Sequence, residues 1–267
     1  MASGSREKLL EVQGLTMDFG GLRAVDQVGL DIYAGEIVAL IGPNGAGKTT
    51  FFNCVTGIYT PTSGDVLIHP PAGKSQRING MKPNRITTLG MARTFQNIRL
   101  FPAMTVLENV MIGRHCRTST NIFGAIWRGE TARCEERSTV EKSYRLLEKV
   151  GLDGLANEFS RNLSYGAQRR LEIARALATD PFLLLLDEPA AGMNPQETHE
   201  LEALISRIRA EEKVAILLIE HDMKLVMNIS DRIYVMEYGK EIATGTPREI
   251  KENPQVIEAY LGEEAHA

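Results

Sequence analysis

The chain has 267 residues, with 30 Lys and Arg against 34 Asp and Glu, a formal net charge of −4, and 43% apolar residues. This composition is typical of a soluble globular protein, and the length suffices for a hydrophobic core without disulfides or metals. The acidic balance, without a long block of Lys or Arg, argues against a nucleic-acid partner, because binding to phosphates requires clustered cations. The three cysteines lack metal-site spacing, and their odd number suits a reducing compartment.

The apolar runs of the sequence are short. The longest, residues 182–186 and 214–219, fall far short of the roughly 20 residues that a membrane-spanning helix requires. The N-terminal residues contain no apolar segment of the kind found in signal peptides. We therefore expect the chain to remain in the cytoplasm and not to cross a bilayer itself.

The first predicted elements are strands. Residues 10–13, Leu-Glu-Val-Gln, and residues 24–32 largely alternate apolar and polar side chains, which predicts a small antiparallel sheet. Residues 37–41, 183–186 and 215–219 are continuous apolar runs, as expected of strands that are buried on both faces. Because helical segments alternate with these buried strands, we predict an α/β core with a mainly parallel sheet.

Helix signals lie between the strands. Asn194 is placed to cap a helix that begins at Pro195, and apolar side chains follow at helical spacing up to Ile208. A second helix is predicted to begin at Ser138, and Gly151 is placed to end it. The polar residues 114–137 are interpreted as an insertion.

Residues 42–49 match the pattern G-x-x-x-x-G-K-[S/T] directly after a predicted buried strand. Glycines in this pattern let backbone N–H groups surround phosphate oxygens, and the following helix directs the positive end of its dipole at the same charge. Lys48 would bridge the β- and γ-phosphates of a nucleotide, and the Thr49 hydroxyl would ligate Mg²⁺. The predicted phosphate-binding residues are Gly42, Pro43, Asn44, Gly45, Ala46, Gly47, Lys48, Thr49 and Thr50.

Two carboxylates, Asp187 and Glu188, follow the buried strand at residues 183–186. Ligands bind at the carboxyl ends of strands in open α/β sheets, so this position suits a catalytic site. Asp187 would ligate Mg²⁺, and Glu188 would act as a general base for water. A lone Asp-Glu pair would more simply solvate a strand end, but the phosphate loop in the same chain favours the catalytic interpretation.

Residues 162–177 contain Ser164, which is placed to cap an amphipathic helix. The order Leu-Ser-Tyr-Gly-Ala, between the two motifs above, resembles the signature segment, usually Leu-Ser-Gly-Gly-Gln, of ATP-binding cassette (ABC) ATPases. The resemblance covers nearly the whole chain. Phe19 matches the aromatic residue that stacks on adenine in this family, Gln96 matches its Q-loop glutamine, and His221 matches its switch histidine.

The resemblance is closest to the ATPases of branched-chain amino acid importers. These typically carry Arg-Thr-Phe-Gln, Glu-Pro-Ala-Ala-Gly, Ile-Glu-His-Asp-Met and a terminal Tyr-Leu-Gly-Glu, which occur here at residues 93–96, 188–192, 219–223 and 260–263. Three residues depart from the general ABC pattern. Tyr165 and Asn194 are similar to the importer subgroup, whereas Ala167 replaces the signature glutamine and leaves Ser164 and Gly166 to contact ATP.

The resemblance implies that residues 1–267 form one ABC ATPase domain. A P-loop NTPase core would span about 9–96 and 180–245 and include the antiparallel β subdomain. A helical signature subdomain would span about 97–179, and a C-terminal helical tail about 246–267.

The resemblance also implies the cofactors ATP and Mg²⁺. The catalytic residues would be Glu188, His221 and Gln96, and the residues nearest the metal would be Thr49, Asp187 and Gln96. Two such subunits meet head to tail in the family, so Ser164 and Gly166 of one chain would contact the ATP held by the other chain.

The implied partners are transmembrane permease subunits, a second ATPase subunit and, indirectly, a substrate-binding protein. The importer resemblance favours a heterodimer with a sister ATPase over a homodimer, and it implies a peripheral position at the cytoplasmic face of the inner membrane. We therefore predict an ATP-hydrolysing subunit that powers an importer of branched-chain or other hydrophobic amino acids.

Other functions are weaker interpretations of the same motifs. An ATPase of a related transporter with another cargo, such as a lipid, would share the cassette, and the cargo stays open because the ATPase need never touch it. A soluble ABC ATPase would usually show a heptad coiled coil or a second cassette, and neither occurs here. A P-loop kinase or GTPase would leave the signature segment and His221 unexplained.

The apolar stretch at residues 97–106 directly follows Gln96 and is interrupted by Pro102. By resemblance it opens the helical subdomain and faces the membrane. Phe101 and Met104 are either core residues or, if they are partly exposed, a patch that accepts a short helix from a membrane subunit.

Overall fold

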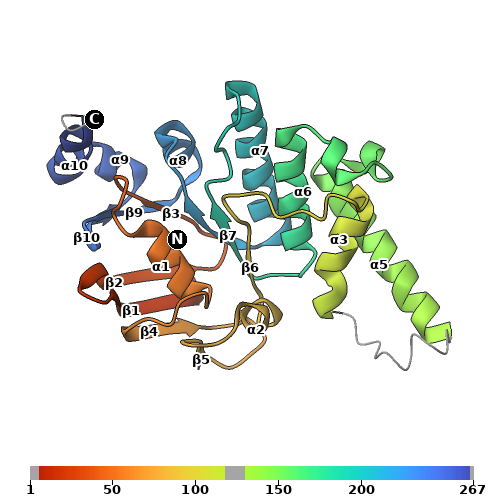
Figure 1. The fold of residues 1–267 in the computed structure, drawn as a ribbon, viewed down its shortest axis with the longest axis horizontal. Coiled ribbons are helices and arrows are strands. Elements are labelled where there is room, and N and C mark those ends of the chain that lie inside the picture. Colours follow the sequence, from red (N-terminus) through yellow and green to blue (C-terminus); the bar gives the residue numbers. More distant parts are fainter. Residues whose placement is uncertain (1–5, 118–129, 265–267) are drawn as a thin grey trace, which may run out of the picture. The chain divides into compact units, whose positions relative to one another are not determined.

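The computed structural model describes residues 6–117 and 130–264. The chain divides into two compact units (Figure 1). Unit 1 contains residues 1–93 and 182–267, and unit 2 contains residues 94–181.

Unit 1 contains two sheets. The antiparallel sheet has the strand order β2-β1-β4-β5, formed by β1 (Lys8–Phe19), β2 (Leu22–Tyr33), β4 (Ser63–Ile68) and β5 (Gln76–Arg77). The second sheet has the order β10-β9-β3-β8-β7-β6, formed by β3 (Ile37–Ile41), β6 (Met91–Arg93), β7 (Leu183–Asp187), β8 (Ala215–Ile219), β9 (Arg232–Glu237) and β10 (Lys240–Gly245). Neighbours in this sheet run parallel except β9 and β10. The predicted fold class is therefore confirmed.

The parallel sheet is the centre of unit 1, because every residue of β3, β7 and β8 is buried. Alternate residues of β3 point to opposite faces. Val38 and Leu40 pack with α1 (Lys48–Val55) and the antiparallel sheet, whereas Ala39 and Ile41 pack with apolar residues of α8 (Met223–Ile229) and of the C-terminal helices. Continuous apolar runs in the sequence therefore became strands covered on both faces, as expected.

The remaining helices of unit 1 have clear N-terminal signals. They are α2 (Pro83–Thr88), α7 (Pro195–Glu212), α9 (Pro247–Lys251) and α10 (Pro254–Glu264). The predicted start of α7 is confirmed, because the Asn194 side chain accepts hydrogen bonds from the backbone N–H groups of Gln196 and Glu197. Its buried residues are Leu201, Leu204, Ile205 and Ile208, which is the predicted apolar face.

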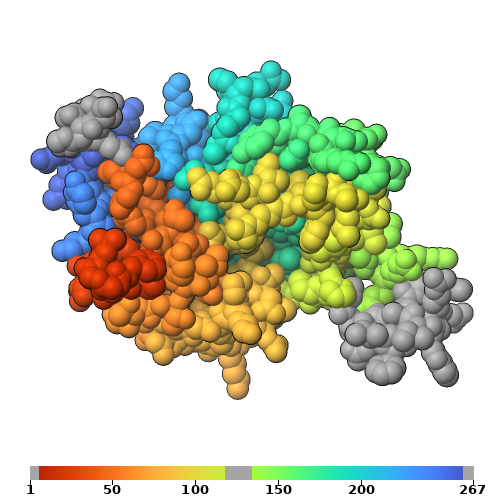
Figure 2. Space-filling view, viewed as in Figure 1, coloured from red at the N-terminus to blue at the C-terminus, as the bar shows by residue number. Residues whose placement is uncertain are grey.

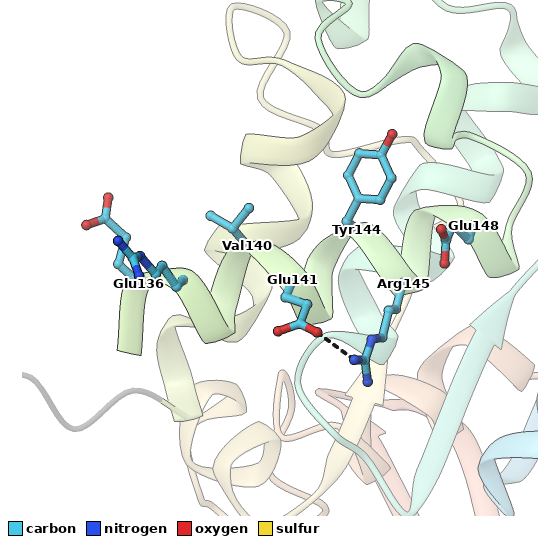
Figure 3. Close-up of a pocket in the computed structure, with 7 residues that line it drawn as sticks. Glu136, Val140, Glu141, Tyr144, Arg145 and Glu148 are labelled. Atoms are coloured by element: carbon cyan, nitrogen blue, oxygen red, sulfur yellow. Dashed lines mark hydrogen bonds and ion pairs between the residues drawn. The ribbon is translucent and has the colours of Figure 1, made fainter. Parts of the chain in front are cut away.

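Unit 2 contains the helices α3 (Val106–Arg114), α5 (Glu130–Lys149) and α6 (Tyr165–Leu177). Short 3₁₀ turns lie at His115–Arg117, Asp153–Leu155 and Ser160–Asn162. The three helices pack against one another in pairs. α5 carries exposed charged residues, including the ion pair between Glu141 and Arg145 (Figure 3).

One prediction for unit 2, the start of a helix, was wrong. The helix predicted to begin at Ser138 begins at Glu130, because residues 130–137 favour a helix and contain no residue that would end one. The predicted insertion at 114–137 lies only partly within the described residues. Its first residue, Arg114, is buried and pairs with Asp180, and its last part is the first half of α5, while residues 118–129 lie outside the described part of the chain.

Candidate active site

The loop between β3 and α1 has the backbone conformation that its glycines allow. Gly42 and Gly47 have φ values of 151° and 94°. A Cβ atom at Gly42 would clash with the carbonyl oxygen of Met236, and one at Gly47 would clash with that of Ala24. Strands β9 and β2 therefore lie directly against this loop, and other residue types do not fit at these two positions.

Lys48 begins α1 and is 5% exposed. Its Nζ donates hydrogen bonds to the carbonyl oxygens of Gly42, at 2.6 Å, and Pro43, at 2.8 Å. The N-cap residue is Gly47, which has no side chain to accept from the first N–H groups of the helix. An ammonium group and the positive end of a helix dipole therefore lie at the same loop, a combination that attracts phosphate.

Asp187 ends β7 and is 3% exposed. One of its carboxylate oxygens, Oδ2, lies 2.7 Å from Nη2 of Arg93, at the end of β6. The other terminal nitrogen of Arg93 donates to Asn53 Oδ1 at 2.7 Å and to Thr56 Oγ1 at 2.8 Å. One guanidinium group therefore ties the predicted metal ligand to α1. No signal in the sequence indicated this role for Arg93, although Arg93 begins the Arg-Thr-Phe-Gln motif.

Glu188 and His221 were predicted separately and lie together in the structure. Glu188 follows β7 and has a φ of 47°, a left-handed conformation that is uncommon for a residue other than glycine. Its Oε1 lies 3.1 Å from Nε2 of His221, which follows β8. The Glu188 backbone N–H donates to the Ile219 carbonyl at 2.9 Å, so the neighbouring strand ends hold the two side chains side by side.

Glu220 is a site residue that the sequence analysis missed. It is 3% exposed and accepts a hydrogen bond from the Ala190 backbone N–H at 2.6 Å. Its second oxygen accepts from the backbone N–H groups of His221, at 2.9 Å, and Asp222, at 3.4 Å. Burial raises the pKa of this carboxyl, and the three N–H groups oppose that shift. Its role could have been suspected from the sequence, because Glu220 lies between a predicted buried strand and the candidate residue His221.

Phe19 ends β1 and is 42% exposed. The ring of Tyr59 meets it edge to face, with ring centroids 5.4 Å apart and an interplanar angle of 81°. This geometry is favourable for aromatic pairs and holds the Phe19 ring in place. A half-exposed aromatic ring is suited to stacking on a planar ligand such as a nucleobase.

The remaining candidate residues belong to unit 2. Ser164 caps α6, and its Oγ accepts a hydrogen bond from the Ala167 backbone N–H. Gly166 and Ala167 are buried in the first turn of this helix. Gln96 is exposed, and its backbone carbonyl accepts a hydrogen bond from Arg169 of α6.

Metal binding by protein groups alone is not supported in residues 6–117 and 130–264. These residues contain no group of three or more His, Cys, Asp or Glu side chains that could hold a metal ion. Two candidate oxygen donors, the exposed Thr49 of the phosphate loop and the buried Asp187 at the end of β7, instead fit Mg²⁺, which takes few protein ligands and binds through phosphates and waters. In the same described ranges, no helix has the length and apolar character needed to cross a membrane.

Comparison with known proteins identifies the family. Residues 25–191 match the model of the ABC transporter family, and residues 240–266 match a model described as branched-chain amino acid ATP-binding cassette transporter. The chain is 51% identical to the high-affinity branched-chain amino acid transport ATP-binding protein LivG of Escherichia coli K12, over 96% of this chain and 99% of that protein. It is 50% identical to the corresponding protein BraF of Pseudomonas aeruginosa, over 96% and 98% of the two chains.

Solved structures agree with this assignment. The crystal structure of an ATP-binding cassette of an ABC transporter in its ADP conformation superimposes with a TM-score of 0.81 and 31% identity, over 96% of this chain and 99% of that chain. A nucleotide-free ATP-binding cassette superimposes with a TM-score of 0.80 and the same identity. The chain therefore belongs to the ATP-binding cassette transporter family, whose members bind and hydrolyse ATP.

Proposed function

We propose that this chain is the ATPase subunit of an importer for branched-chain or other hydrophobic amino acids. The observation that carries the proposal is the match of residues 240–266 to the branched-chain amino acid cassette model. Within that range, residues 240–264 contain β10, α9 and α10, outside the nucleotide-binding motifs shared by all ABC ATPases. The identity of 51% with LivG supports the same cargo and disfavours the lipid alternative.

The loop at residues 42–50 would bind the phosphates of ATP, and Phe19 would stack on its adenine. The Lys48 ammonium now bonds to two loop carbonyls. It would exchange these acceptors for β- and γ-phosphate oxygens, which are charged and therefore stronger partners. The glycines at positions 42 and 47 already bring the backbone to the conformation that the loop requires, so little ordering would accompany binding.

Thr49, Asp187 and Gln96 are the residues that we propose nearest to Mg²⁺. The ion would neutralise charge on the phosphates during hydrolysis. Arg93 contacts Oδ2 of Asp187 at 2.7 Å and would hold the carboxylate in a fixed orientation.

Glu188 would act as the general base that accepts a proton from the attacking water. His221, 3.1 Å from it, would orient this carboxylate and contact the γ-phosphate. The buried Glu220 would position both residues, because it bonds to the loop that follows Glu188 and to the His221 backbone.

A complete site would require a second subunit. Ser164 and Gly166 would contact the ATP held by a sister ATPase, in a heterodimer arranged head to tail. Because these contacts would exist only in the closed dimer, ATP binding would favour closure, and hydrolysis would remove that preference. The dimer would bind two transmembrane permease subunits at the cytoplasmic face of the membrane and power their transport cycle. A substrate-binding protein would deliver the amino acid to these permeases.

The permease contact that we propose is an apolar patch of Phe101, Met104 and Phe159 in unit 2. These side chains are 45%, 36% and 42% exposed, which disfavours a core role for Phe101 and Met104. A backbone bridge joins Thr105 to Phe159, so the two segments that carry the patch are neighbours. The segment that carries Phe101 and Met104, yellow in Figure 2, lies at the molecular surface. An exposed apolar patch of this kind suits a short helix.

The test is purification of the chain with its membrane partners, followed by reconstitution into proteoliposomes. We expect co-purification of two permeases and a second ATPase, and ATP-driven uptake of leucine, isoleucine or valine in the presence of the binding protein. Co-purification with a lipid-extracting permease, or ATP hydrolysis that no hydrophobic amino acid stimulates, would contradict the proposal.

A further inference from the structure

Three charged side chains follow one face of α6 at a spacing of three residues: Arg169, Glu172 and Arg175, here called the charged triplet. Arg169 and Glu172 are 2% and 1% exposed, and their side chains lie 3.4 Å apart. Burial raises the pKa of the Glu172 carboxyl, and the two guanidinium groups oppose that shift. Removing charges from water is costly, so a buried set of this kind requires specific partners.

Those partners are backbone groups of residues 95–101, here called the Gln96 segment. Arg169 donates to the carbonyls of Phe95, at 2.7 Å, and Gln96, from its two terminal nitrogens. Arg175 donates to the carbonyl of Arg99, and Glu172 accepts from the Arg99 backbone N–H. The Gln96 segment has no helix or strand of its own, so the charged triplet replaces the hydrogen bonds that a regular element would supply.

The Gln96 segment connects two residues with proposed functions. Gln96, near its start, is exposed and is a proposed Mg²⁺ neighbour, and Phe101, at its end, belongs to the apolar patch. The guanidinium of Arg175 lies 6.0 Å from the centre of the Phe101 ring. The helix that carries the charged triplet begins directly after Ser164, which is proposed to contact the partner's ATP.

We propose that the charged triplet is a positioning element that fixes the Gln96 segment to the signature helix α6. Gln96, the apolar patch and Ser164 then move as one body, so that displacement of the patch by a permease reaches both nucleotide contacts. This inference rests on the roles proposed above for Gln96, Phe101 and Ser164. The planar fork of Arg169 suits the task, because it holds two successive carbonyls at once, which a lysine does not.

If the charged triplet only stabilised the fold, a folded variant without it would still couple uptake to ATP hydrolysis normally. One double variant separates this stabilising role from the positioning role. Replacing both members of a buried ion pair with apolar residues of similar volume is often neutral or stabilising. Arg169→Met/Glu172→Met therefore removes the bonds of Arg169 and Glu172 to the Gln96 segment together with the charges of that ion pair. Arg175, whose side chain is 17% exposed, keeps its bond to the Arg99 carbonyl. The assay is the reconstituted importer complex, with uptake, substrate-stimulated ATP hydrolysis and ATP affinity measured together.

We expect the double variant to unfold near the wild-type temperature and to bind ATP with unchanged affinity. Substrate-stimulated hydrolysis and uptake should fall by about 2- to 30-fold, the range that residues carrying coupling between sites usually show. The KM for ATP should stay constant while kcat falls. Wild-type uptake by the folded double variant would overturn the proposal.

Three further variants complete the experiment. Arg169→Lys keeps a cation beside Glu172 but loses the planar fork, so uptake should fall while ATP affinity stays normal. If the double variant does not fold, normal uptake by Arg169→Lys overturns the proposal. Arg145→Met, which removes an exposed arginine of α5 (Figure 3), is the control and should behave as wild type. Gln96→Ala tests the proposed role of Gln96 itself. Normal activity of Gln96→Ala refutes that role. Impaired activity of Gln96→Ala together with normal activity of the double variant refutes only the positioning role of the charged triplet.

Discussion

Glu220→Gln tests whether the buried carboxylate behind Glu188 and His221 positions the catalytic loops. The carboxylate uses one oxygen for the Ala190 N–H, at 2.6 Å, and the other for the His221 and Asp222 N–H groups. Glutamine has the same size but only one oxygen, and its amide nitrogen would face a backbone donor. The variant therefore keeps the contact to one loop and loses the contact to the other.

The magnitude follows from the lost bonds. A hydrogen bond to a charged group contributes about 1.5–3 kcal/mol, so loss of one side releases a loop that carries a catalytic residue. If that free energy is expressed in the transition state, kcat falls about 10- to 100-fold, because each 1.36 kcal/mol corresponds to a factor of ten. ATP affinity should stay unchanged, since the phosphate loop is untouched. The assay is steady-state hydrolysis by the complex, with ATP binding measured by calorimetry.

The control is Glu202→Gln on α7, where the same change affects a carboxylate that contacts Asn228 and His199. We expect it to retain wild-type kcat. If Glu220→Gln also turns over at the wild-type rate, the positioning role of Glu220 is refuted. A matched fall in kcat and in ATP affinity would instead indicate general disruption of the site.

The same variant changes the pH dependence of stability. Burial raises the folded-state pKa of Glu220 above its ordinary value of 4.5, so the folded protein binds more protons than the unfolded chain between the two values. The contribution of this group to the free energy of unfolding is therefore fully present below pH 4.5 and is lost as the pH rises through the raised pKa. The free energy of unfolding, measured with denaturant, should fall less steeply with rising pH in Glu220→Gln than in wild type. Identical pH dependences of the two proteins would contradict the raised pKa of Glu220.

Glu188→Gln should bind ATP but lose hydrolysis by about 10²- to 10⁴-fold, because the general base is removed while the phosphate loop is intact; turnover at the normal rate would contradict this role. Lys48→Ala should weaken ATP binding by about tenfold or more, since it deletes a charge-assisted contact to the phosphates, and calorimetry that finds unchanged affinity would count against it. Phe101→Asp should leave the fold and ATP binding of the isolated subunit unchanged, because the side chain is 45% exposed, yet weaken assembly with the permeases. Normal co-purification and uptake would remove the apolar patch from the mechanism.

The sequence alone determined the elements whose signals are local. The continuous apolar run at residues 37–41 became a strand with every residue buried, because both of its faces had to be covered. The capped start of α7 is confirmed because a cap is made by side chains within the same turn of helix. The phosphate loop was likewise identifiable, since its glycines and Lys48 act on backbone groups close to them in the chain. Ser138, by contrast, can cap a helix but does not do so here, because α5 already begins at Glu130 and includes Ser138.

Only the tertiary structure decided which distant residues meet. Arg93 reaches Asp187 across 94 positions, and Arg169 reaches Phe95 across 74, so no periodicity or cap could indicate these pairs. Glu220 follows the buried strand β8, but its role depends on the Ala190 N–H, which another strand end delivers. The exposure of Phe101 was equally undecided, because an apolar residue after a glutamine is compatible with a core or with a surface. Buried charges and exposed apolar groups are set by what the fold places against them, and that information is not local in the chain.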